Sequence, residues 1–283
     1  MAIKLGGGGG SASQINEIVT LSNTADTVTL SDERVYLRGG LVAASSTYPL
    51  ATTSLRYLGT NFSVGSQMTT PTAIAWDGTH FWVVSNDADE VFKYTAAGVY
   101  TGTAFNVAGQ TINPKGIAWD GTFFWVLDSG GTTYKYNSAG VYQSVSWSPS
   151  GVSQPVDIAW DGTHFYIVDY SQSKIFKYNS AGVAVTNYDV SGQVTNPHGV
   201  TWDGTYFWVS SLSDYVYKYN SSFVYQGVRF DATAAGGSHL GIGWDGTNLL
   251  VVGNTLDKIT KFTSSNGVAS VLNLGGQNYV RVA

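Results

Sequence analysis

The tripeptide Trp-Asp-Gly occurs five times in the chain, and this repeat constrains the fold more than any other feature. The spacings between copies are 43, 41, 42 and 42 residues, and the tryptophans are Trp76, Trp119, Trp160, Trp202 and Trp244. The similarity extends along the whole unit, as in WDGTHFWVVSNDADEVFKY and WDGTHFYIVDYSQSKIFKY. Repeats of this period are typical of β-propellers, in which each unit forms one blade around a central axis.

Each unit contains four short segments that we interpret as strands. The Asp-Gly pair after each tryptophan predicts a tight hairpin, because glycine accepts a positive φ. The second strand is apolar at successive positions, as at 81–84 and 124–127, which indicates burial of both its faces. The first strands carry only Ala or Gly at 73/75, 116/118 and 241/243, as expected where sheets converge on an axis, and Asp157 and Thr201 depart from this pattern.

The ends of the repeat region determine the number of blades. Residues 57–67 align with the fourth-strand region 100–110, so we expect them to complete the fifth unit and thereby remove open sheet edges. The predicted fold is all-β, a five-bladed propeller of about 42 residues per repeat closed by an N-terminal strand. A sixth blade improvised from the two termini stays an open alternative. The predicted domains are an N-terminal tether and attachment module at 1–53, the propeller at 54–267, and a C-terminal strand segment at 268–283 that pairs with the N-terminal module.

Composition excludes several classes of protein. The chain is 43% hydrophobic and 14% aromatic, which is unlike a disordered segment, although only 12% of it is charged. A net charge of −5 without a basic patch argues against nucleic acid as a partner. The absence of cysteine removes thiolate metal sites and cysteine nucleophiles. No apolar stretch approaches the roughly 20 residues of a membrane span, and no signal peptide precedes the glycine-rich start, so we expect neither membrane insertion nor a secretory leader.

Few residues have the chemistry of a catalytic or metal site. His80 and His164 occupy the same hairpin position, which predicts exposed turn residues. We expect the repeated aspartates to form Asx turns and the lysines of the third strands to extend over aromatic rings. His198 and His239 precede first strands near the mouth of the channel, where a bound ion with Asp157 is an open alternative. The prediction from the sequence is a protein without catalytic residues, metal or cofactor.

Comparison of the copies separates two faces of the propeller. The turns after strands one and three are nearly identical, whereas the connections after strands two and four differ, and these lie on the opposite face. Because function on such scaffolds usually lies on loops, we predict recognition on the variable face. The predicted receptor-binding residues are Asn86, Asp87, Asp89, Lys115, Asp128, Asp157, Asp169, Tyr170, His198, Asp214, Tyr215 and His239. The five repeat tryptophans are predicted to be structural.

The motif WDGTxFWV…VYKYNSAGVY, with Pro-x-Gly-Ile-Ala-Trp before the next copy, resembles the NHL-type propeller repeat. The aromatic WDGT copies, the glycine-rich start and the Tyr-Val-Arg end also resemble bacteriophage tail proteins over residues 30–283. That resemblance implies a fibre or tip protein of the virion tail, assembled in the host cytoplasm, and it transfers no catalytic residues. Phe223 replaces the turn glycine and Leu249-Leu250 replaces the aromatic pair, departures that put only the inferences about local packing at these positions in doubt.

These observations together predict a non-enzymatic tail protein whose variable face binds a receptor or glycan on a bacterial surface. We expect its N-terminal module to contact other tail proteins and the chain to form a homo-oligomer. Two alternatives stay open. The first is a free-standing, lectin-like propeller that binds carbohydrate, and the second is an NHL-type lyase or hydrolase that uses Asp157, His198 and His239.

Overall fold

A computed structural model describes the backbone of residues 2–6, 15–20, 27–29, 34–37, 40–43, 47–49, 55–236, 239–264, 271–274 and 277–280, and the side chains of 61–236 and 241–263. The chain divides into two compact units, one of residues 56–263 and one of residues 1–55 with 264–283. Each unit is described by itself. The described part of the chain contains no helix with the length and hydropathy of a membrane span.

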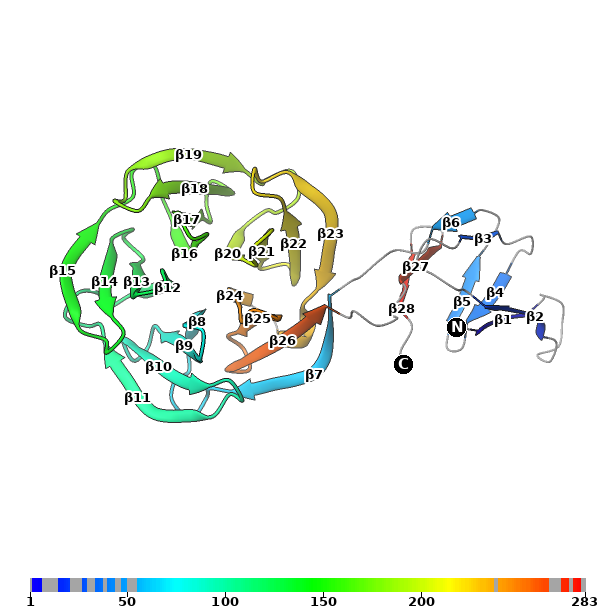
Figure 1. The fold of residues 1–283 in the computed structure, drawn as a ribbon, viewed down its shortest axis with the longest axis horizontal. Coiled ribbons are helices and arrows are strands. Elements are labelled where there is room, and N and C mark those ends of the chain that lie inside the picture. The colour runs from blue at the N-terminus through cyan, green and yellow to red at the C-terminus, as the bar shows by residue number, and fades with distance from the viewer. Residues whose placement is uncertain are drawn as a thin grey trace. The chain divides into compact units, whose positions relative to one another are not determined.

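Residues 56–263 form five four-stranded antiparallel sheets around a central axis (Figure 1). Blade 1 contains β8 (Pro71–Trp76), β9 (His80–Ser85), β10 (Glu90–Thr95) and β11 (Tyr100–Asn106). Blade 2 contains β12 (Pro114–Trp119), β13 (Phe123–Asp128), β14 (Thr133–Asn137) and β15 (Tyr142–Trp147). Blade 3 contains β16 (Pro155–Trp160), β17 (His164–Asp169), β18 (Lys174–Asn179) and β19 (Ala184–Asp189).

Blade 4 contains β20 (Pro197–Trp202), β21 (Phe207–Ser211), β22 (Tyr215–Tyr219) and β23 (Tyr225–Asp231), followed by a 3₁₀ turn η1 (Thr233–Ala235). Blade 5 combines β24 (His239–Trp244), β25 (Asn248–Gly253) and β26 (Lys258–Ser264) with β7 (Leu55–Ser63), which lies beside β26 in Figure 1. The backbone N–H of Val64 donates to the carbonyl of Asp257 at 2.8 Å at the end of this pairing. The predicted five-bladed ring with an N-terminal closing strand is therefore confirmed, and the six-bladed alternative is wrong.

The second unit contains short paired strands. The pairs are β1 (Ala2–Gly6) with β2 (Ile15–Thr20), β3 (Thr27–Thr29) with β6 (Thr47–Pro49), β4 (Arg34–Leu37) with β5 (Gly40–Ala43), and β27 (Val271–Leu274) with β28 (Gln277–Val280). The role of this unit in attachment stays a prediction.

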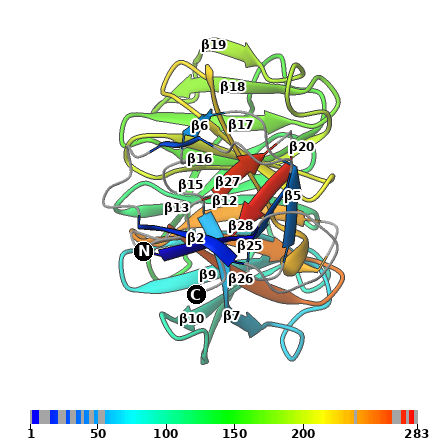
Figure 2. The ribbon, with the colours of Figure 1, turned by 90° about the vertical axis from the view of Figure 1, so that its right-hand side faces the viewer.

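The hydrophobic core of the propeller lies between neighbouring blades. Phe81 and Val83 of β9, for example, form one buried cluster with Leu250 and Val252 of β25. Val84, the next residue of β9, is also fully buried, in the cluster that blade 1 shares with blade 2. Second strands are therefore covered on both faces, as their uninterrupted apolar sequence predicts. In the edge-on view, β18 and β17 follow one another inward from β19, the outermost strand of blade 3 (Figure 2).

The repeated Asp-Gly hairpins follow one design. In blade 1, Gly78 has a φ of +94°, a conformation that disfavours any residue with a Cβ atom. Asp77 Oδ1 accepts hydrogen bonds from the backbone N–H groups of Thr79 (2.8 Å) and His80 (2.7 Å), and its Oδ2 accepts one from Trp82 Nε1 (2.7 Å). The predicted Asx role is confirmed, and the additional bond to the second strand fixes the hairpin on its own blade.

One departure from the repeat, Phe223 in place of the turn glycine, retains aromatic packing between the blades. In blade 2 the turn glycine, Gly140, lies so close to Phe105 that an added Cβ would be 2.2 Å from the Cβ of that ring residue. In blade 4 the ring instead comes from the turn itself. Phe223 adopts a φ of +55°, is 6% exposed, and stacks on Phe207 at 4.5 Å and on Tyr188 at 4.6 Å. The packing at this position is therefore retained, because the aromatic contact is made from the other side of the interface.

Candidate functional site

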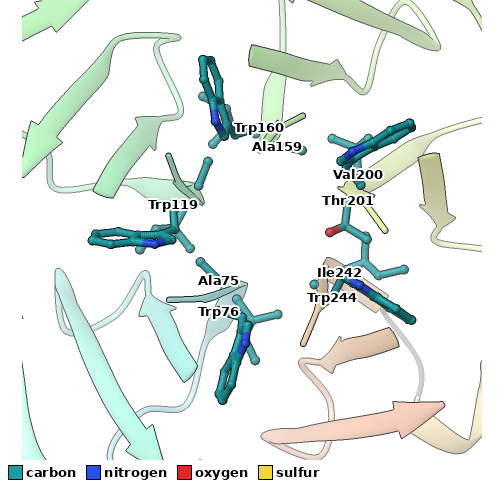
Figure 3. Close-up of a pocket in the computed structure, with 15 residues that line it drawn as sticks. Ala75, Trp76, Trp119, Ala159, Trp160, Val200, Thr201, Ile242 and Trp244 are labelled. Atoms are coloured by element: carbon teal, nitrogen blue, oxygen red, sulfur yellow. The ribbon is translucent and has the colours of Figure 1, made fainter. Parts of the chain in front are cut away.

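The first strands of the five blades enclose an axial cup of about 130 Å³ (Figure 3). Each strand contributes three consecutive residues to the wall: an Ile or Val, a residue that is Ala, Gly or Thr, and a Trp. Thr201 therefore provides the one side-chain hydroxyl among the lining residues. No lining residue is titratable, and the cup therefore offers no acid, base or nucleophile beyond that hydroxyl. The labelled indole rings in Figure 3 point away from the axis, toward the spaces between the blades.

Asp157 lies at the inner layer of the same strands, at a position where the neighbouring blades have small residues. It is 2% exposed, and its carboxylate accepts hydrogen bonds from the N–H groups of Ile158 (2.9 Å) and Val200 (3.1 Å) and interacts with that of Ile242. Burial raises the pKa of this carboxyl well above its usual range, and this effect exceeds that of the hydrogen bonds, which lower the pKa. A Cβ added to Gly116 would lie 2.9 Å from the Asp157 Cα, so the expected crowding at the axis is confirmed. The side chain connects blade 3 to blades 4 and 5 and is not accessible to a ligand.

Several acids of the variable face have a structural role. Asp87, at the loop after β9, accepts hydrogen bonds from the Thr69 N–H (3.0 Å), the Thr69 hydroxyl (2.7 Å) and the Thr70 N–H (3.2 Å) of the segment before β8. Against a desolvation cost, the hydrogen bonds from Ser85 and Thr69 lower its pKa to about 2. Asp128 accepts one from the Thr111 hydroxyl, and Asp169 accepts one from the Gln154 N–H (3.2 Å). These carboxylates connect the two loops of their own blade, so the acidity of this face reflects loop architecture.

The remaining predicted residues lie at separate places. Asp89 and Asp214 have positive φ values of 52° and 65° in the turns before third strands. Asn86 donates its side-chain N–H to Asn113 at 3.4 Å, and the Tyr215 ring faces Arg229 at 4.5 Å. The side chain of His239 lies outside the described residues. This face therefore does not gather the predicted residues into one site.

Three of them meet near the channel mouth. The Tyr170 ring lies 5.7 Å from that of His198, in an edge-on arrangement. The Lys115 ammonium interacts electrostatically with the His198 imidazole and disfavours its protonated form. Burial, with a contribution from Lys115, lowers the pKa of His198 to about 4, and its Nδ1 is buried without a hydrogen-bond partner among the described atoms. The imidazole is consequently uncharged at neutral pH. No group of three His, Asp or Glu side chains that would hold a metal occurs among the residues the structure describes.

The opposite face, which carries the Asp-Gly hairpins, contains a larger cavity. A cleft of about 270 Å³ lies between blades 2 and 3, lined by Asp120, Thr122, Phe123, Trp125, Lys135, Trp160, Phe165 and Ser180. Phe123 and Trp160 are half-buried, whereas Thr122 and Ser180 are exposed. The Lys135 Nζ lies 3.7 Å from the centroid of Phe123 and 5.2 Å from that of Trp125. The cleft therefore combines ring surfaces with hydroxyl groups and one ammonium.

Equivalent positions in the other blades carry the same kinds of residue. The ammonium of the third-strand lysine lies over a ring of the second strand in blade 1 (Lys93 on Trp82, 5.1 Å), blade 3 (Lys177 on Tyr166, 5.4 Å) and blade 4 (Lys218 on Trp208, 5.3 Å). The predicted placement of these lysines over rings is confirmed. Sequence analysis missed the cleft because it forms between two repeats, although the alternation of lysine and aromatic residues was the signal for it.

Neither a protein-family model nor a curated protein matches the chain. Among solved structures, glutaminyl cyclase from Myxococcus xanthus matches with a TM-score of 0.58 at 13% identity, covering 77% of this chain and all of that one (100%). A streptogramin B lyase matches with a TM-score of 0.45 at 16% identity, covering 81% of this chain and 70% of that one. Virginiamycin B lyase from Staphylococcus aureus matches with a TM-score of 0.45 at 14% identity, covering 86% and 93%.

At such low identity these likenesses show the propeller fold and transfer no activity or substrate to this chain. The comparisons as a whole overturn two predictions. The assignment to a non-enzymatic virion tail depended on resemblances to tail proteins and NHL repeats that no comparison reproduces, whereas the fold is shared with glutaminyl cyclase, an enzyme. The prediction of a tail fibre is therefore wrong, and so is the inference that a propeller of this kind has no catalytic activity.

Proposed function

We propose that the protein binds saccharides in the clefts between blades on the Asp-Gly face. The observation that carries this proposal is the cleft of about 270 Å³ between blades 2 and 3. A sugar presents apolar C–H surfaces and a rim of hydroxyl groups. The half-buried rings of Phe123 and Trp160 suit the first, and Thr122, Ser180 and Lys135 supply donors and acceptors for the second.

Repetition of the lysine–ring arrangement in four blades strengthens the proposal. A single shallow site binds weakly, but several equivalent sites on one rigid ring raise the avidity for a repeating glycan by about 10²–10⁴ without any new contact. We therefore propose the lectin-like function considered from the sequence for the face opposite to the one predicted there.

Glycan-array screening of the full chain, followed by calorimetric titration with the best ligand, tests this function. We expect Phe123→Ala to weaken binding at its cleft. Asn86→Ala, on the opposite face, is the matched control and retains full binding. An array without any bound saccharide overturns the proposal, and so does a Phe123→Ala variant with wild-type stoichiometry and affinity at every site.

A second candidate function rests on His198. Its uncharged imidazole beside Lys115 suits proton transfer on an anionic substrate, because a bound anion would offset the lysine charge that helps to lower the histidine pKa. Since the fold is that of glutaminyl cyclase, turnover of a glutaminyl peptide is the first assay. We expect His198→Gln to reduce any such activity by about 10²-fold or more. Turnover unchanged in that variant removes this candidate.

A further inference from the structure

The lysines of the clefts carry a charge that the protein leaves without a partner. Among the described side chains, no carboxylate lies within ion-pair distance of Lys93, Lys135, Lys177 or Lys218. All four are half-buried and lie near an aromatic ring of their own blade, and Lys135 also lines the cleft between blades 2 and 3. An ammonium has three N–H donors, and none of these donors has a protein acceptor among the described residues at the four positions.

The nearest carboxylate in the cleft is already occupied. Asp120 Oδ1 accepts hydrogen bonds from the N–H groups of Thr122 (2.8 Å) and Phe123 (2.7 Å), and Oδ2 accepts one from Trp125 Nε1 (2.7 Å). Both carboxylate oxygens are therefore occupied, and no ion pair joins Asp120 to Lys135. The free donors of the lysine are therefore the strongest polar feature that a ligand meets in this cleft.

The fifth interface provides an internal contrast. Lys261 lies 3.6 Å from Asp245 Oδ2 and donates a hydrogen bond to the carbonyl of Ala96, across the boundary to blade 1, at 3.0 Å. Its ring contact is also with blade 1, at 4.8 Å from Phe81. This lysine is thus used to join blades 5 and 1, while its four equivalents are left available.

We infer that the cleft at Lys135 recognises acidic saccharides, whose carboxylate pairs with the lysine while the sugar ring lies against the aromatic wall, and that the equivalent positions of Lys93, Lys177 and Lys218 do the same. This inference rests on the proposed saccharide function and specifies its ligand class. A charge-assisted hydrogen bond to a lysine at a partly desolvated site corresponds to about a tenfold preference for the acidic sugar over its neutral counterpart. The bound stoichiometry is four per chain, because the lysine of the fifth interface is already paired.

Titration of the full chain with glucuronic acid and with glucose isolates the carboxylate. We expect glucuronic acid to bind about tenfold more tightly, and this preference to disappear in the variant K93M/K135M/K177M/K218M while glucose binding persists. Lys261→Met, which removes the one paired lysine of the set, is the control and keeps the preference. Circular dichroism establishes that each variant is folded.

A measurement on the wild type alone keeps the inference testable if the quadruple variant fails to fold. Raising the salt concentration from 0.05 to 0.5 M weakens glucuronic acid binding about fivefold and leaves glucose binding unchanged, since only the former depends on a screened charge. Equal affinity for the two sugars, or salt-independent binding of both, overturns the inference while saccharide binding stands. Failure of both sugars and of every other glycan overturns the proposed function itself.

Discussion

Replacement of Asp157 by alanine tests the inter-blade connection at the axis. The variant removes the acceptor of the N–H groups of Ile158 and Val200, which are 2.9 and 3.1 Å from the carboxylate, and the interaction with the N–H of Ile242. The last two groups belong to blades 4 and 5, so the loss affects the cohesion of the ring as well as one strand.

The size of the effect follows from the burial of this site. A buried N–H group left without a partner costs about 1–3 kcal/mol. The two groups of the neighbouring blades therefore predict a decrease of about 2–5 kcal/mol in the free energy of unfolding. Asp157→Asn keeps an acceptor oxygen and the side-chain volume, and we expect it to lie within about 1 kcal/mol of the wild type at low pH.

The dependence on pH adds a second observable with a defined sign. Burial raises the Asp157 pKa in the folded protein above its value of 3.8 in the unfolded chain. Its contribution to stability is therefore complete below pH 3.8 and is lost as the pH rises through the folded-state pKa. Because asparagine does not ionise, Asp157→Asn gains stability relative to the wild type over that range.

Urea unfolding, followed by tryptophan fluorescence and far-ultraviolet circular dichroism, measures these differences from pH 3 to pH 8. Asp189→Ala is the control, since this carboxylate is exposed on the surface and we expect its removal to leave the urea midpoint at neutral pH close to that of the wild type. An Asp157→Ala variant that unfolds at the wild-type urea concentration refutes the reasoning. Parallel pH profiles for the wild type and Asp157→Asn refute the assigned direction of the pKa shift.

Three further substitutions test other parts of the ring. Burial, with a contribution from the Lys115 charge, lowers the pKa of His198 from 6.5 to about 4. The free energy of unfolding of the wild type therefore decreases by up to about 3 kcal/mol as the pH falls through this window. We expect His198→Gln to flatten this part of the pH profile of thermal unfolding, and an unchanged slope contradicts the assigned burial. Phe223→Gly relieves the strain of a positive φ but removes the stack on Phe207. We expect a net decrease of about 2–4 kcal/mol in the free energy of unfolding measured in urea, and an increase contradicts the packing argument. Asp203→Ala removes the carboxylate that accepts hydrogen bonds from the hairpin N–H groups and from Trp208 Nε1. In the same assay we expect the free energy of unfolding to decrease by about 1–3 kcal/mol, and an unchanged urea midpoint contradicts this role.

Local signals in the sequence were sufficient for the fold. The Asp-Gly pair specifies a hairpin through a φ that glycine adopts easily, and the apolar run at 81–84 specifies a strand covered on both faces. The alignment of 57–67 with 100–110 predicted the closing strand, because an incomplete blade would leave an open edge. Each of these inferences uses information contained within one repeat.

The candidate site depends on contacts between repeats, and these were less predictable. Asp157 differs visibly from the small residues at its position, but its main partners lie more than 40 positions away along the chain, at Val200 and Ile242. The variable loops suggested recognition, yet Asp87 and Asp169 are occupied by backbone donors of their own blades. The cleft at Lys135 was overlooked because the Asp-Gly turn is nearly identical in every repeat and was therefore interpreted as purely structural. The space beside that turn is formed together with the next blade, so it is not visible within one repeat.

The placement of β7 beside β26 determines how the ring responds to mechanical load. The end of β7 meets the start of β26 at the Val64–Asp257 hydrogen bond, so the two segments that leave the ring, before Leu55 and after Ser264, depart from the opposite end of this strand pair. Tension applied through those segments loads the hydrogen bonds between β7 and β26 one after another from that end, so these bonds break in sequence and not all at once. The fifth blade is therefore the expected point of opening under force, and the four blades built from consecutive strands should yield only after it.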